Sequence, residues 1–307
     1  MKDLEKRKKK IEHAKSGMVQ STGEKVYDLC INIIAVLVTL ITFYPIYYIL
    51  IASFSRPLGV DNGDVIFTMV EPTVEAYKRA FRLPNLWISY GNTFFYAVFG
   101  VAMNMILTTT MAFSLSRKRL VGRKFFTLMV VFTMWFNAGL IPTYLNFSQL
   151  HMLDTRAAII VGFGISAYNL IIMKSFFESI PEEMEEAATV DGASSFRTFF
   201  QIFIPMSKPA LATVVMFYLV NRWNGYFWPM TLLRDDMKMP LQVLLKKLIV
   251  DQVANETEAA IVTSASTWSP TTRIYALMMI AIVPMLVIYP VLQKYFKAGM
   301  TLGAVKG

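Results

Sequence analysis

The uncharged stretch LCINIIAVLVTLITFYPIYYILIA, from Leu29 to Ala52, decides the fold class of this chain. It runs for 24 residues without Asp, Glu, Lys or Arg, and a helix needs about 20 apolar residues to cross the hydrocarbon core of a bilayer. It is too long for the apolar core of a cleaved signal peptide, and it follows 28 mostly polar residues. We therefore expect it to remain as a membrane anchor.

Five further stretches of similar character recur along the chain. They cover residues 88–116, 125–153, 157–173, 209–233 and 274–293. Among them, only 209–233 contains a charged side chain, which is Arg222. We therefore predict an all-α polytopic membrane protein with six transmembrane helices.

The composition agrees with a membrane protein. Hydrophobic residues make up 55% of the 307 residues and charged residues 17%, compared with about 45–50% and about 25% in soluble domains. The mean hydropathy is +0.47. The one cysteine, Cys30, has no second cysteine to pair with. These values exclude a soluble enzyme, a disordered protein and a disulfide-stapled secreted domain.

The distribution of Lys and Arg predicts the orientation in the membrane. Six crossings place both termini on one side, and the segments on that side hold 19 of the 30 basic residues. Loop 117–124 alone holds five of them and no acid. Basic loops are retained in the cytoplasm, so we expect a multi-pass plasma-membrane protein with both termini cytoplasmic. The net charge of +9 then reports topology rather than nucleic-acid binding.

The chain reads as one membrane domain with a short basic extension. We expect a cytoplasmic segment at residues 1–28 and a single six-helix domain at residues 29–307. Two external loops, 53–87 and 234–271, are long enough to form small lids or docking surfaces.

The connection between the fourth and fifth spans, residues 178–206, carries a distinctive pattern. It reads SIPEEMEEAATVDGASSFRTFFQIFIP from Ser179 to Pro205. Ser179 and Glu182 have the spacing of a capping box, which predicts the start of a short helix. Gly192 predicts its end, because glycine readily adopts the left-handed conformation found there. A second segment follows, whose phenylalanines are spaced to bury one face: Phe196, Phe199, Phe200 and Phe203.

Such a helix pair at the membrane surface suits docking into a groove of a cytoplasmic partner, although a plain solvated connector is the alternative. The loop resembles the EAA coupling motif of the permease subunits of bacterial ATP-binding-cassette importers. The residues that carry the resemblance are Glu186, Ala187, Ala188, Asp191, Gly192, Ile202 and Pro205.

Two other stretches are similar to the carbohydrate branch of this family. One is WNGYFWP from Trp223 to Pro229, and the other is the glycine-ending tail from Tyr295 to Gly307. The resemblance covers residues 29–307 and looks closest to the permeases for oligosaccharides and polysaccharides. It implies the type I importer permease fold with a cytoplasmic coupling helix. Gly225 departs from the family pattern, because many relatives carry a larger residue there.

The resemblance also implies the partners of the chain. They are a second homologous permease, two ATP-binding-cassette ATPase subunits, an extracytoplasmic solute-binding protein and the lipid bilayer, with no nucleic acid. Glu186 would pair with a basic residue of the ATPase, Gly192 would permit the turn, and Ala187 and Ala188 would allow close approach.

No Gly-x-x-x-x-Gly-Lys-Ser/Thr phosphate loop occurs in the sequence. We therefore expect a transport subunit rather than an enzyme, without catalytic residues, a metal site or a cofactor of its own. ATP and Mg²⁺ would be bound by the partner ATPase subunits.

Side chains suited to a sugar gather near the end of the fifth span, since saccharides are bound by aromatic faces together with amide and hydroxyl groups. The candidates for the substrate pathway are Asn221, Arg222, Trp223, Asn224, Tyr226 and Trp228, with Tyr168 and Asn169 in the fourth span. An interfacial aromatic belt would explain the aromatic residues equally well. A charge inside an apolar span is costly, so Arg222 faces either an anionic sugar or another helix.

Three other functions are alternatives to import of a saccharide. An importer permease for a non-sugar solute is compatible with the same coupling motif. An ion-coupled secondary transporter would need acids inside its spans, and the six stretches contain none. A membrane-embedded glycan enzyme would need paired external carboxylates, and the acids available there show no such spacing: Asp61, Asp64, Glu71, Asp235 and Asp236.

Overall fold

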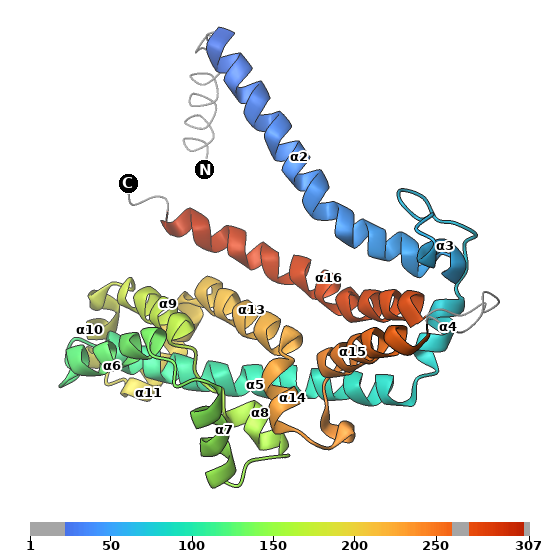
Figure 1. Ribbon diagram of the computed structural model, residues 1–307. Coiled ribbons are helices and arrows are strands. Elements are labelled where there is room, and N and C mark those ends of the chain that lie inside the picture. Colours follow the sequence, from blue (N-terminus) through green and yellow to red (C-terminus); the bar gives the residue numbers. More distant parts are fainter. Residues whose placement is uncertain (1–21, 260–269, 304–307) are drawn as a thin grey trace.

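The computed structural model describes residues 22–259 and 270–303, and every regular element in these two ranges is a helix (Figure 1). This confirms the predicted all-α class. The long helices are α2 (Thr22–Ser53), α5 (Pro84–Ser116), α13 (Lys208–Asn224), α15 (Leu241–Ala259) and α16 (Pro270–Gly303). The shorter ones between them are α3 (Pro57–Asp61), α4 (Glu75–Phe81), α6 (Arg123–Trp135), α7 (Leu140–Gln149), α8 (Arg156–Val161), α9 (Ala167–Glu178), α14 (Phe227–Leu232) and the 3₁₀ helix η2 (Asp236–Lys238).

The connection between α9 and α13 forms a series of short helices. They are α10 (Glu182–Val190), α11 (Ser195–Thr198), the π-helix η1 (Phe199–Phe203) and α12 (Ile204–Met206).

Three helical segments are long and apolar enough to cross a bilayer: Lys25–Ser53, Pro84–Ser116 and Thr271–Pro290. Two bent pairs raise the number to five within the described ranges. The chain bends by 118° between α6 and α7, and it bends by 83° between the α11–α12 segment and α13. The predicted fourth span, 157–173, differs from the expectation of one long helix, because it is divided between α8 and α9.

Helix α2 extends away from the bundle, and its first half lies apart from the other helices in Figure 1. None of the residues in the most apolar 18-residue stretch of this helix is buried. The helix packs only near its end, where Ile51 and Ala52 join a small core with Val60 and Val65. The predicted loop 234–271 contains α15, which packs against the bundle, since Leu241 and Leu245 of α15 pack with Leu277 of α16.

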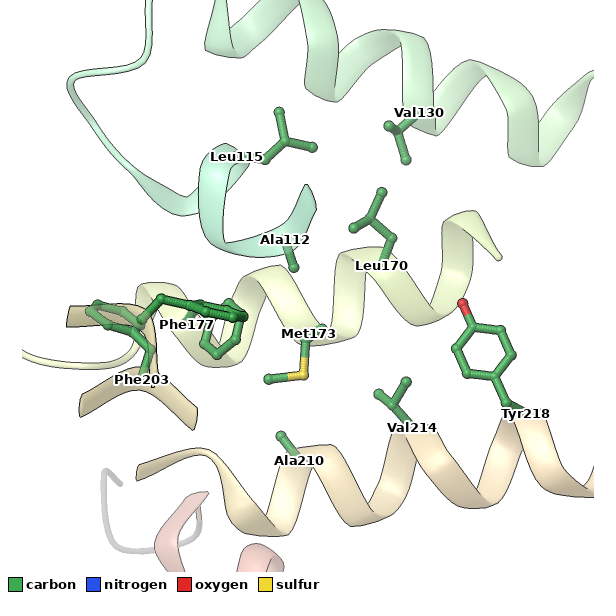
Figure 2. Packing of buried hydrophobic residues seen from close by; sticks show 11 residues of the cluster. Ala112, Leu115, Val130, Leu170, Met173, Phe177, Phe203, Ala210, Val214 and Tyr218 are labelled. Atoms are coloured by element: carbon green, nitrogen blue, oxygen red, sulfur yellow. The ribbon is translucent and has the colours of Figure 1, made fainter. Parts of the chain in front are cut away.

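Helix α5 is the central element, and α8, α9, α13 and α15 all pack against it. Four residues spaced by one turn form a buried stripe along it: Gly100, Asn104, Thr108 and Ala112. Small and hydroxyl-bearing residues allow helices to approach closely and to hydrogen-bond between them. At its end, Ala112 and Leu115 pack with Met173 and Phe177 of α9 and with Ala210 and Val214 of α13 (Figure 2).

The break between α8 and α9 has a local cause in the sequence. Each helix has its own N-cap: the Thr155 side chain accepts from the Ala158 N–H and the Ser166 side chain from the Asn169 N–H. Gly162 and Gly164 lie in the segment between them. An unwound segment inside a membrane domain is tolerated only where protein groups satisfy its backbone.

Arg222 of α13 donates the hydrogen bonds that these backbone carbonyls need. Its Nη2 donates to the carbonyls of Ile160 at 3.1 Å and Phe163 at 3.0 Å, and its Nη1 donates to the carbonyl of Ile159. The Nε donates to Oδ1 of Asn104 at 3.0 Å, and Nδ2 of Asn104 in turn donates to the carbonyls of Phe163 and Gly164. The structure thus places Arg222 against another helix, the second of the two predicted alternatives.

Gly100 of α5 makes room for this arginine. A Cβ built on Gly100 would lie 2.9 Å from Nε of Arg222, closer than such atoms approach. On the next turns, the Thr108 hydroxyl lies 2.6 Å from the Tyr218 hydroxyl, which accepts from the Ser166 N–H at 3.0 Å. Helices α5 and α13 therefore hold both sides of the break.

Replacing Arg222 by Met should destabilise the chain while roughly preserving side-chain volume. The change removes the side-chain donors to the carbonyls of Ile159 and Ile160 and one of the two donors to the carbonyl of Phe163, at a cost of about 1–3 kcal/mol for each buried group left unpaired. We expect a clearly lower apparent melting temperature for the detergent-solubilised protein. Arg234→Met is the matched control, because Arg234 is exposed. Equal melting temperatures for the two variants would contradict the stabilising role of Arg222 at the α8–α9 break.

Candidate functional site

Helix α10 begins at Glu182, directly after Pro181, and has three acids in its first turn. The predicted capping box between Ser179 and Glu182 is wrong. Ser179 ends α9 instead: its hydroxyl donates to the carbonyl of Phe176 at 2.7 Å. The hydroxyl is thereby occupied, and α10 has no side-chain cap. Its acids still suit the positive end of the helix dipole.

The end of α10 lies where the sequence predicted it. Asp191 is the C-cap, and Gly192 has φ +74°. The Gly192 N–H donates to the carbonyl of Thr189 at 3.0 Å, and the Ala193 N–H donates to the carbonyl of Ala188 at 2.8 Å. These two bonds form a Schellman motif, which requires a left-handed residue at this position. Glycine adopts that conformation without the strain of a Cβ.

The basic loop 117–124 holds α10 against the bundle. Arg117 forms an ion pair with Glu185, and both side chains are mostly buried, with exposed fractions of 11% and 19%. Arg119 is a second partner of Glu185 at 3.5 Å, and its Nη2 also donates to the Ser195 hydroxyl at 3.0 Å. Lys118 contacts Glu182 at 2.5 Å on the exposed side. Loop 117–124, whose charges predicted the orientation in the membrane, therefore also clamps α10 to the bundle.

Arg117 also connects this clamp to the apolar core. Its guanidinium lies 4.1 Å from the ring centroid of Phe203 and 5.0 Å from that of Phe113. Burial lowers the pKa of Arg117, and the Glu185 carboxylate opposes that shift. The side chain stays charged at neutral pH, since an arginine pKa starts far above it. The guanidinium of Arg117 thus forms both the salt bridge to α10 and the ring contacts with α5 and η1.

Lys118 and Glu182 reinforce each other in the same way at the surface. The hydrogen bond and charge of Lys118 lower the pKa of Glu182, and Glu182 raises the pKa of Lys118. A carboxyl with a lowered pKa favours the folded state above its ordinary pKa and loses that contribution as the pH falls through the folded value. The pair therefore persists at neutral pH.

The four phenylalanines of the second segment divide into two pairs. Phe199 and Phe203 are buried, at 6% and 1% exposure, and join the core around Phe177. Phe196 and Phe200 are exposed at 74% and 50%, and their ring centroids lie 4.6 Å apart. The prediction that all four bury one face is wrong, because the segment is covered on one side only.

Most of the predicted coupling residues are exposed on the surface of α10 and of the short helices that follow it. Glu186, Ala187, Asp191 and Pro205 are exposed, Ala188 is buried in α10, and Ile202 packs against the core. Glu186 forms no ion pair within the described part of the chain and borders a depression of about 480 Å³ with Glu185 and Arg117. Their coupling role stays a prediction. Sequence reasoning missed Arg117 and Glu185, although an acid-free basic loop and an acid-rich loop on one predicted side were a usable signal.

The predicted pathway residues do not form one cluster. Trp223 is 2% exposed, its indole N–H donates to the Ala281 carbonyl at 3.1 Å, and its ring meets Phe94 edge-on at 5.2 Å. Trp228 is half-buried against Phe163, with the ring centroids 5.3 Å apart, and Asn169 is buried. The exposed members are Asn221, Asn224, Tyr226 and Tyr168. Among the residues described, no three potential ligands come together for a metal ion.

Comparison with known proteins identifies the family. Residues 99–302 match the family described as binding-protein-dependent transport system inner membrane component. The chain is 36% identical to the polygalacturonan/rhamnogalacturonan transport system permease protein YtcP of Bacillus subtilis, over 92% of this chain and 99% of that protein. It is also 36% identical to protein LplC of the same organism, over 94% and 98%.

A solved structure agrees with these sequence matches. It is the crystal structure of a bacterial ABC transporter involved in the import of the acidic polysaccharide alginate. The TM-score is 0.83 at 40% identity, covering 90% of this chain and 99% of the other. The predicted resemblance and permease fold are confirmed, and the chain is a membrane transport component rather than an enzyme. It belongs to the family of binding-protein-dependent transport system inner membrane components.

Proposed function

We propose that this chain is the transmembrane permease subunit of an ATP-binding-cassette importer that carries oligosaccharides or polysaccharides into the cell. The observation that carries the proposal is α10, a surface helix clamped to the bundle through Arg117 and Glu185 with its other face free. The names of two similar proteins, one for polygalacturonan and one for alginate, support an acidic saccharide as the substrate.

The energy for transport enters through other subunits. The chain has no phosphate-binding loop, so two partner ATPase subunits bind ATP and Mg²⁺. A second homologous permease completes the pathway across the membrane, and an extracytoplasmic binding protein delivers the saccharide. In this arrangement α10, loop 117–124 and both termini face the cytoplasm, and residues 29–307 act as one membrane domain.

The outward face of the coupling loop suits a groove on an ATPase subunit. Four exposed apolar side chains lie on α10 and on the short helices that follow it, and one of them, Val190, lines the same depression as Glu186. They are Met184 at 43%, Val190 at 87%, Phe196 at 74% and Phe200 at 50% exposure. A short helix with apolar anchors fits a hydrophobic groove, and Glu186 pairs there with a basic residue.

Arg117 transmits movement from this face to the bundle. When the ATPase subunits close, they displace α10, and Glu185 pulls on Arg117. Because the guanidinium of Arg117 lies against the rings of both Phe113 and Phe203, the displacement reaches α5 and the core around α9. Such coupling requires that the ATPase contacts differ in free energy between the two states of the permease.

A row of exposed side chains on α13 is the candidate pathway surface. Phe217, Asn221 and Asn224 follow one face at helical spacing, and the Phe217 ring lies 6.1 Å from that of Tyr168. This row offers aromatic faces and amides together, as a saccharide requires. Arg222 and Trp223 lie on other faces and position it.

Gly192→Pro should uncouple ATP hydrolysis from transport. Proline holds φ near −65° and lacks the N–H that Gly192 donates, so it cannot keep the φ of +74°. Gly192→Ala is the matched control, because a Cβ there meets nothing within 4 Å and costs only about 1–2 kcal/mol of left-handed strain. We expect the Pro variant to reach the membrane but to lose uptake and substrate-stimulated ATPase activity in the reconstituted importer. Normal stimulation in that variant would refute the role of the turn.

Val190→Asp should weaken the docking of the ATPase subunits. Val190 is 87% exposed, so the change adds a charge to the docking face without disturbing the core. We expect less ATPase subunit to co-purify with the variant, by about tenfold for a loss of about 1.4 kcal/mol. Val121→Asp is the control, since Val121 is 90% exposed on the adjoining basic loop. Equal recovery of the ATPase from both variants would argue against this docking face.

Uptake measurements should identify the substrate class. In cells that lack this chain, reintroducing it with its partner subunits should restore uptake of labelled oligogalacturonides or alginate oligosaccharides. A neutral maltooligosaccharide should be taken up poorly by the same cells. Uptake that continues when the ATPase subunits are deleted would overturn the proposed function, and uptake of the neutral sugar alone would overturn its acidic substrate.

A further inference from the structure

A basic depression lies beside α6 and α9 and shares Lys118 with the contacts that hold α10. Its volume is about 740 Å³. The residues that line it are Lys118, Leu120, Gly122, Arg123, Lys124, Thr127, Leu128, Val131 and Lys174. None of them belongs to the predicted coupling or pathway sets.

The cations in this depression exceed the acids that neutralise them. Arg123 and Lys174 share one carboxylate, that of Glu178, with Lys174 Nζ at 2.8 Å from its oxygen. The Lys174 side chain is only 12% exposed, so its charge is largely removed from water and needs compensation. Lys124 is exposed and forms no ion pair with the residues that the structure describes.

Two further groups in the depression can donate to an anion. Helix α6 begins at Arg123 with Gly122 as N-cap, and its first turn has neither a side-chain cap nor an acid. The positive end of its dipole is therefore open. One turn later, the Thr127 hydroxyl oxygen is buried without a hydrogen-bond partner among the described residues. An anion with several acceptor oxygens, such as a phosphate group, matches this set.

The apolar surroundings indicate where the phosphate group comes from. Helix α6 exposes a large apolar surface, including Phe125 at 62%, Leu128 at 67% and Phe132 at 59%. A free anion needs no such surface, whereas a phospholipid has acyl chains to place along it. Basic pockets between helices at the cytoplasmic side of a membrane suit anionic headgroups.

We propose that the depression formed by loop 117–124, α6 and Lys174 binds the phosphate headgroup of an anionic phospholipid of the cytoplasmic leaflet. Lys174 and Lys124 supply the charge, the Thr127 hydroxyl and the start of α6 donate to the phosphate oxygens, and the acyl chains lie along α6. The leaflet assignment rests on the proposed function, which places loop 117–124 in the cytoplasm. The lipid also lies next to Lys118 and Arg123, whose acidic partners are Glu182 at the start of α10 and Glu178 at the end of α9.

Native mass spectrometry of the purified importer complex can test this site. The complex is released from nanodiscs of phosphatidylglycerol or of phosphatidylcholine, and retained lipids are counted for wild type and for Lys124→Gln/Thr127→Val. Neither residue takes part in the coupling clamp. We expect wild type to retain phosphatidylglycerol preferentially, and the double variant to retain about fivefold less, the factor expected from one lysine near an anionic lipid.

The matched control is Lys208→Gln, which removes an exposed cation at the start of α13 outside the depression. It should retain phosphatidylglycerol as wild type does. Full retention by the double variant, equal loss in the control, or no lipid preference in wild type would each overturn the proposal. Displacement of the lipid by millimolar inorganic phosphate would assign the site to a free anion instead. The lipid count requires no transport, so failed saccharide uptake with retained lipid would count against the proposed function alone.

Discussion

The ion pair between Arg117 and Glu185 is the constraint that holds α10, the proposed coupling helix, against the bundle. The guanidinium is held by a carboxylate on one side and by the rings of Phe113 and Phe203 on the other. Removing Glu185 would leave the mostly buried guanidinium of Arg117 without its carboxylate, and breaking such a pair typically costs about 3–5 kcal/mol. Helix α10 therefore cannot move far from the bundle while this pair is intact. A displacement of α10 must instead carry α5 and η1 with it.

Helix α9 extends this constraint into the membrane domain, because it is held at both ends. At its start, the Ser166 N–H donates to Tyr218, next to the break that Arg222 and Asn104 satisfy. At its end, Glu178 pairs with Arg123 and Lys174. Between these ends its apolar face fills the core shown in Figure 2. The helix can therefore carry a displacement from the coupling surface to the unwound segment.

The sequence predicted those features that depend on a few neighbouring residues. The apolar stretches located α2, α5, α13 and α16, and Asp191 with Gly192 located the end of α10, since both signals are local. They did not locate α15, which lies within the predicted loop 234–271. The start of α10 was predicted wrongly because Ser179 had a competing use at the end of α9. Ser166, Gly162 and Gly164 were a local signal for the break in the predicted fourth span, but the donors that satisfy its carbonyls come from α5 and α13, and no pattern within that span identifies them. The clamp of loop 117–124 likewise joins residues more than sixty positions apart.

The end of α13 illustrates why neighbours in sequence are an unreliable guide to a binding surface. Consecutive residues of a helix point about 100° apart, so Asn221, Arg222 and Trp223 cannot share one face. Arg222 turns toward α5 and the α8–α9 break, and Trp223 turns toward α16. Both must be buried for α13 to hold its place in the bundle. Asn221 and Asn224 then share the remaining face, because three residues nearly complete a turn. The residues that the sequence grouped into one cluster are thus divided by the helical period: one face fixes α13 to the bundle, and the face with Asn221 and Asn224 stays exposed.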